Sequence, residues 1–154
     1  MVAGVLLKSW LASRQIRHVA RNRDAVPTTF AEKVSLAAHR KAADYTVTKT
    51  RFGLIELALA TAMLLCWTLL GGLDALNTVL MRFIGPGMMQ QLALLAVFAL
   101  IGGLIELPLT LYQTFVIEAR FGFNKMTPRL WFADLVKSIF VGTLIGLPIA
   151  ALIL

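Results

Sequence analysis

The chain has 154 residues, of which 58% are hydrophobic and only 15% are charged. Soluble domains average about 45–50% apolar and about 25% charged residues, so the composition excludes a disordered tail and argues against an ordinary soluble domain. The length fits one domain, which we take as a single region over residues 1–154. One cysteine and two histidines exclude a disulfide framework and a zinc finger within this sequence, because both need clustered ligands.

The net charge of +7 belongs entirely to the first third of the sequence. Residues 1–53 hold ten Lys and Arg against three Asp and Glu, a difference of +7, whereas residues 54–154 hold five of each. A basic arm beside an apolar remainder indicates a membrane protein whose arm faces water. We expect lipid headgroups as the anions that the arm meets, and no nucleic acid. Strong salt-dependent DNA binding is the weaker alternative.

Residues 1–26 leave two interpretations open. The run before Lys8 is too short to span a membrane, and no small-residue cleavage site follows that would make it a signal peptide. The segment is either the clipped end of a longer first span or a short interfacial helix. In the second case Trp10 lies in lipid, and Arg14 and Arg17 lie at the headgroups.

Residues 29–70 predict a long helix that runs from the cytoplasm straight into the first full span. Thr29 and Glu32 have the spacing of a capping box, and no Pro or Gly follows until Gly53. From Leu54 to Leu70 only Glu56 is ionisable, so this run is apolar enough to cross a bilayer.

A second span is expected at residues 88–117. Gly102, Gly103, Glu106 and Pro108 lie near its middle, and this combination predicts a kink.

A third span is expected at residues 128–154. Thr127 suits its N-cap, and Pro128 suits the first helical position, where the missing N–H costs nothing. The apolar run continues to Leu154 without a polar anchor, so we expect this span to be truncated.

The charge of the connections predicts the orientation in the membrane. Residues 8–53 and 118–137 are rich in Lys and Arg, whereas residues 71–88 hold one Arg and one Asp. The excess of Lys and Arg predicts that the two basic segments are cytoplasmic. The predicted fold class is all-α: a multi-span transmembrane helical protein with a long cytoplasmic helix running into the first full span.

No catalytic motif is present in the sequence. It holds no HExxH, no Gly-rich phosphate loop and no GxSxG, so we expect no catalytic residue and no metal ligand here. Cys66 lies mid-span, where we interpret it as a packing residue, and His39, with no second ligand nearby, as a solvated helix residue.

Glu106 is the deepest carboxyl in the predicted spans, and two roles are open for it. It either lines a cavity or relays protons, or it is protonated and hydrogen-bonded to a neighbouring helix. We favour the second role because no basic partner is visible within the spans.

Residues 114–138 hold the most specific pattern in the sequence. Gly122 suits a left-handed helix end, and aromatic residues surround the following turn. Glu118 is spaced to face Arg120, Lys125 or Lys137, while Asp134 and Lys137 form a same-face pair three residues apart.

This segment resembles the hallmark connection of the type I CAAX prenyl proteases, the Ste-type integral-membrane zinc metalloendopeptidases. Residues 35–52 are similar to the cytoplasmic stretch before the second span in bacterial members, and the resemblance covers about residues 10–154. The positions that match the family motif are Glu118, Gly122, Phe123, Asn124, Thr127, Asp134 and Lys137.

The resemblance implies a helical chamber within the membrane and a zinc ion held by an HExxH helix and a distant glutamate. This chain lacks HExxH and the third zinc ligand, so the resemblance implies that the catalytic zinc domain is absent and that the chain alone is not catalytic. We assign the seven motif positions to packing and support of the chamber floor.

The resemblance also implies partners: the bilayer, the remainder of the protease, and a peptide or membrane-protein substrate. For a bacterial member it implies the inner membrane.

A different class of function is also open. The chain could be a stand-alone multi-pass scaffold or carrier subunit that oligomerises through its small residues. The glycines concerned are Gly71-Gly72, Gly102-Gly103 and the pair Gly142 and Gly146.

Overall fold

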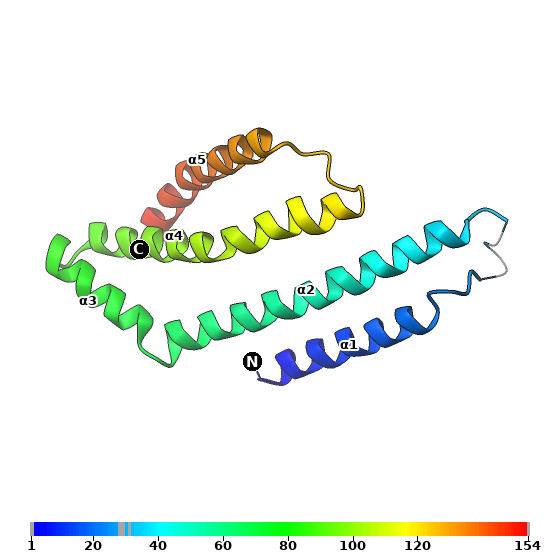
Figure 1. Ribbon diagram of the computed structural model, residues 1–154. Coiled ribbons are helices and arrows are strands. Elements are labelled where there is room, and N and C mark those ends of the chain that lie inside the picture. Colours follow the sequence, from blue (N-terminus) through cyan, green and yellow to red (C-terminus); the bar gives the residue numbers. More distant parts are fainter. Residues whose placement is uncertain (1, 28–29, 31, 154) are drawn as a thin grey trace. The chain divides into compact units, whose positions relative to one another are not determined.

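The computed structural model describes residues 2–27, 30 and 32–153 (Figure 1). Its elements are all helical, which confirms the predicted all-α class. In chain order they are α1 (Val2–Arg21), α2 (Leu36–Thr68), α3 (Gly72–Ile84), α4 (Met88–Tyr112), the π-helical turn η2 (Gln113–Glu118) and α5 (Pro128–Ile153).

Three helices in the described part of the chain are long and apolar enough to cross a membrane. They are α2, the continuous helix Met88–Glu118 formed by α4 and η2, and α5. Each contains one of the three apolar runs that the sequence pointed to, so the multi-span prediction is confirmed.

The first long helix begins later than predicted. α2 starts at Leu36, and residues 32–34 form a turn and a bend. The hydroxyl of Ser35 accepts a hydrogen bond from the Ala38 amide at 3.2 Å, so Ser35 is the N-cap. Serine is as good a cap as threonine and stands directly before the helical run. Thr29, the expected cap, lies outside the described residues.

The chain divides into two compact units, the first of which comprises residues 1–64 and 112–124. Within it α1 runs antiparallel to the first part of α2 (Figure 1), since Arg23 contacts Asp44 whereas Lys8 lies near Gly53. The buried apolar side chains among the described residues all belong to this unit: Ala43, Phe52, Ile117 and Phe121.

The second unit comprises residues 65–111 and 125–154 and contains a helix that the sequence analysis missed. Residues 71–88 were expected only as a connection, but α3 occupies most of them. Gly71 has φ +75°, and a Cβ on Gly72 would approach the Cys66 carbonyl oxygen to 2.9 Å. This glycine pair therefore forms the tight turn between α2 and α3.

Two contacts hold α3 and the end of α2 to α4. The Gln90 side chain donates a hydrogen bond to the Asn77 side chain of α3, and Gln90 is only 4% exposed. The rings of Trp67 and Phe98 meet edge to face at 5.1 Å.

α4 continues through Pro108 into η2 without a break in helical structure. Proline lacks the backbone N–H that donates a hydrogen bond to the preceding turn of an α-helix, and this is the reason for expecting a kink there. The kink expected around Pro108 stays a prediction, and the π-turn that follows was not predicted.

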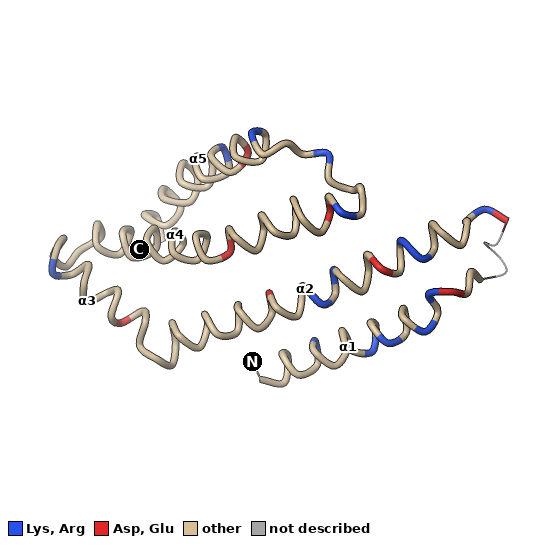
Figure 2. The backbone as a smooth tube through the Cα atoms, viewed as in Figure 1, with Lys and Arg blue, Asp and Glu red and all other residues tan. Residues whose placement is uncertain are grey.

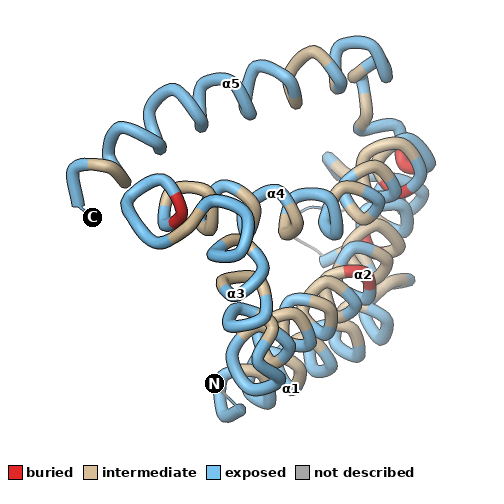
Figure 3. Tube along the Cα trace, turned by 90° about the vertical axis from the view of Figure 1, so that its left-hand side faces the viewer, coloured by how far each residue is buried: buried red, intermediate tan, exposed pale blue. Residues whose placement is uncertain are grey.

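Most residues of α4 and α5 are exposed (Figure 3), and many of them are large and apolar. In an aqueous protein such surface would be unfavourable, whereas lipid or further protein can cover it. This exposure agrees with the membrane-spanning character of both helices.

We predict that Gln90→Leu destabilises the chain, because the side-chain oxygen of Asn77 loses the buried donor that Gln90 provides. Hydrogen bonds between membrane helices contribute about 0.6–2 kcal/mol, so the thermal midpoint in detergent should fall by a few degrees. Gln91→Leu makes the same chemical change at an exposed neighbour and should have little effect. Equal midpoints for the two variants would contradict the role of Gln90.

Candidate functional site

The candidate site is the turn over residues 118–124, which packs on α2 within the first unit. Tyr45 contacts Phe121 edge to face at 5.3 Å and Phe123 at 4.7 Å between ring centroids. Two turns along α2, Phe52 stacks on Tyr112 at 5.5 Å. The order of these contacts makes residues 112–124 run antiparallel to α2.

The turn ends its helix with the hydrogen bonds of a Schellman motif. The Gly122 amide donates to the Ala119 carbonyl at 3.0 Å, and the Phe123 amide donates to the Glu118 carbonyl at 2.9 Å. Gly122 has φ +76°, the left-handed conformation that this motif requires. The structure therefore confirms the predicted helix end, and the motif turns the Phe123 ring toward Tyr45.

Glu118 faces a cation that the sequence analysis did not select. Its Oε1 lies 4.0 Å from Lys49 Nζ of α2. Lys49 also donates a hydrogen bond to the Tyr45 hydroxyl at 3.1 Å. The partner comes from α2 because the aromatic contacts bring that helix alongside, a proximity that spacing within residues 114–138 cannot reveal.

The other motif positions are divided between the two units. Asn124 is the last residue of the first unit, and its amide donates to the Glu118 carbonyl at 3.2 Å. Thr127 belongs to the second unit and caps α5, since its Oγ1 accepts from the Leu130 amide at 3.3 Å. Asp134 and Lys137 follow on α5.

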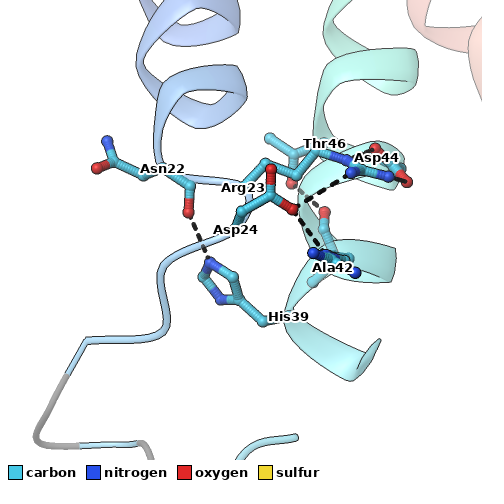
Figure 4. Close-up of polar contacts among 8 residues, drawn as sticks. Asn22, Arg23, Asp24, His39, Ala42, Asp44 and Thr46 are labelled. Atoms are coloured by element: carbon cyan, nitrogen blue, oxygen red, sulfur yellow. Dashed lines mark hydrogen bonds and ion pairs between the residues drawn. The ribbon is translucent and has the colours of Figure 1, made fainter. Parts of the chain in front are cut away.

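A cluster of ion pairs joins the end of α1 to the start of α2 (Figure 4). Arg23 binds both carboxylate oxygens of Asp44, with Nε–Oδ1 at 2.7 Å and Nη2–Oδ2 at 2.8 Å. Arg40 Nε lies 2.7 Å from Asp24 Oδ1. His39 is not merely solvated, since its Nε2 lies 3.0 Å from the Asn22 carbonyl oxygen. This cluster was not predicted, because its contacts between the end of α1 and the start of α2 join residues 16 to 21 positions apart.

The charges in this cluster shift each other's pKa. Asp44 lies well before the apolar run that begins at Leu54, so it is outside the membrane-crossing part of α2. The hydrogen bond from Arg23 lowers the pKa of the Asp44 carboxyl against the opposing effect of desolvation, and charges on Arg23, Arg120 and Arg40 add to the lowering. The same hydrogen bond raises the pKa of the Arg23 guanidinium.

The described residues do not fit a zinc site. No group of three or more His, Cys, Asp or Glu is placed among them to hold a metal ion, and a zinc site needs at least three protein ligands. Cys66 is exposed. Glu106 is exposed on α4, where its carbonyl oxygen accepts a hydrogen bond from the Thr110 hydroxyl at 3.1 Å.

The fold and the turn define a multi-span helical membrane region. Residues 15–154 match a protein family described as the N-terminal region of CAAX prenyl proteases with five membrane helices. The chain belongs to this family and is an integral membrane region of it.

Curated relatives and a solved structure support the assignment. The chain is 29% identical to CAAX prenyl protease 1 of Saccharomyces cerevisiae, covering 99% of this chain and 36% of the relative. It is 31% identical to the Homo sapiens homolog, covering 97% and 34%. It resembles the crystal structure of S. mikatae Ste24p with a TM-score of 0.87 and 26% identity, covering 98% and 36%. The chain thus spans about a third of the length of these relatives.

We predict that Gly122→Ala destabilises the turn. An alanine held in the left-handed conformation costs about 1–2 kcal/mol, and the nearest atom to the added Cβ, Lys41 Nζ at 3.6 Å, is in ordinary contact. The cost therefore comes from the backbone and should lower the thermal midpoint. Gly53→Ala, with open space around its Cβ inside α2, should be neutral or stabilising. A lower thermal midpoint for Gly53→Ala than for Gly122→Ala would contradict the need for a left-handed backbone at Gly122.

We predict that Asp44→Asn loosens the end of α1. A carboxyl whose pKa is lowered by its partner stabilises the folded state above its ordinary pKa of 3.8, and the effect is lost as the pH falls through the lower folded value. Hydrogen–deuterium exchange of residues 16–25, compared with wild type at each pH, should be faster in the variant at neutral pH and equal at low pH.

Asp24→Asn is the matched control for this exchange experiment. Asp24 is 64% exposed in its pair with Arg40, and exposed pairs contribute little. A pH-independent difference between Asp44→Asn and wild type would contradict the role of the Asp44 carboxylate.

Proposed function

We propose that the complete protein is a zinc metalloendopeptidase of the CAAX prenyl protease type and that this chain forms part of the wall of its intramembrane chamber. Family membership and the match to a solved Ste24p structure support this proposal. Zinc and peptide hydrolysis belong to the parts of the protein beyond these residues, since the chain has no HExxH sequence. The proposed partners are the bilayer, the remainder of the protease, and a peptide or membrane-protein substrate.

The observation that carries the proposal is the packing of the turn over residues 118–124 on α2. Tyr45, Phe121 and Phe123 form one aromatic cluster, and Phe121 is buried. This cluster fixes the end of one candidate span against the extension of another. We propose that Glu118, Gly122, Phe123 and Asn124 support the chamber floor through this contact, and that Thr127, Asp134 and Lys137 extend the support by starting the next span.

We propose that residues 8–53 and 118–137 face the cytoplasm. The Lys and Arg residues gather on α1, on the first part of α2 and around residues 120–137 (Figure 2), and the rule that Lys and Arg accumulate in cytoplasmic loops supports this orientation. The bacterial inner membrane stays a prediction from the sequence alone, because the named relatives are eukaryotic.

The stand-alone scaffold gains no specific support. Gly71 and Gly72 form the turn before α3. Gly103, Gly142 and Gly146 line an apolar groove between α4 and α5, which close helix packing would use under either function.

We predict that the 154-residue chain, purified from zinc-supplemented medium, holds far less than one zinc per chain and does not cleave peptides. Protein expressed from the complete reading frame should hold about one zinc and should cleave, because the ligands are then supplied. Plasma mass spectrometry measures the zinc content, and a fluorogenic peptide assay measures cleavage. Stoichiometric zinc in the short chain, or a reading frame without HExxH beyond Leu154, would refute the proposal.

A further inference from the structure

A cavity of about 440 Å³ lies between α1, α2 and the turn over residues 118–124, entirely within the first unit. We call it the arginine cavity. Its charged lining consists of three arginines and one aspartate, and Thr48 adds a hydroxyl. The lining residues are Ala20, Arg23, Ala43, Asp44, Val47, Thr48, Arg51, Arg120 and Phe121.

The cavity carries positive charge that the protein does not neutralise. Arg23 is paired with Asp44 through two hydrogen bonds, so this pair cancels. Neither Arg51 nor Arg120 has a carboxylate within 4.0 Å among the described residues. Three arginines minus one aspartate leave a formal charge of two among the lining residues, and Arg51 and Arg120 both line this cavity.

The cavity lies beside the polar ends of two candidate spans. Arg51 directly precedes Phe52, close to the start of the apolar run of α2, and Arg120 follows the span that ends at Glu118. The stacking of Phe52 on Tyr112 and the contact of Tyr45 with Phe121 set these two span ends side by side. Phospholipid phosphates lie near the polar ends of membrane spans, and basic pockets between membrane helices bind such headgroups.

We propose that the arginine cavity binds a phosphate group, supplied by the headgroup of an anionic phospholipid. Arg51 and Arg120 bind the phosphate oxygens, for which the planar guanidinium is suited, and the Thr48 hydroxyl is available as a further donor. The Arg23–Asp44 pair keeps one wall neutral and fixed. Val47 and Phe121 also line the cavity, and Phe121 belongs to the aromatic cluster with Tyr45. This proposal rests on the membrane placement of the helices and is independent of peptidase activity.

The test is native mass spectrometry of the 154-residue chain in detergent, titrated with phosphatidic acid and with phosphatidylcholine. The double variant Arg51→Gln/Arg120→Gln should lose about tenfold or more of its affinity for phosphatidic acid, since each basic group near a headgroup contributes several-fold. The matched control Arg17→Gln/Arg21→Gln removes the same charge from exposed positions of α1 outside the cavity. It should change the affinity by less than about threefold.

Two further arms separate folding from binding and lipid from free phosphate. Arg51→Lys/Arg120→Lys keeps the charge and should retain most of the affinity that the glutamine variant loses. The second arm tests free phosphate as the source. Inorganic phosphate is titrated, with calorimetric detection, into the chain held in phosphatidylcholine nanodiscs. Equal losses in the cavity and control variants would overturn the proposal, because the binding would then follow net charge alone. Tight binding of inorganic phosphate without any preference for phosphatidic acid over phosphatidylcholine would overturn the lipid as the source.

Discussion

The docking of residues 112–124 along α2 is the contact on which the rest of the first unit depends. α2 has 33 residues, or about 50 Å at 1.5 Å per residue, which exceeds a hydrocarbon core of about 30 Å. Its first part must therefore lie outside the lipid, where a helix with few apolar residues is stable only if a partner covers its apolar side. Ala43 and Phe52 are its buried positions. Residues 112–124 cover this part of α2 through their aromatic contacts with Tyr45 and Phe52. The segment that follows α1 contacts it through the ion pair of Arg23 with Asp44.

The same arrangement concentrates positive charge at one place. The helix hairpin of α1 and α2 brings Arg23 to Asp44, and the docked turn adds Arg120 to the same region. Each arginine alone is an ordinary surface residue, but together with Arg51 they surround one cavity at the polar end of two spans. A structural contact between helices thus creates an electrostatic feature that no part of the chain has by itself.

The sequence predicted those features that depend on local rules. The three spans follow from runs of apolar residues, the Gly122 turn from the need for a left-handed backbone, and the α5 cap from Thr127 and Pro128. α3 was not predicted, because residues 71–88 hold only two charged residues and were interpreted as a connection. Yet Asp74 in its first turn, Arg82 in its last and the spacing of Leu73, Leu76 and Leu80 were readable as an amphipathic helix.

The other features that could not be predicted are contacts that join residues far apart in the chain. Nothing near Glu118 in the sequence points to Lys49, and nothing near Arg23 points to Asp44. For Glu106, too, the neighbouring sequence does not identify a partner. Its side chain is exposed on α4, and an ionisable group facing lipid is costly. This face of α4 is therefore predicted to meet water or another helix.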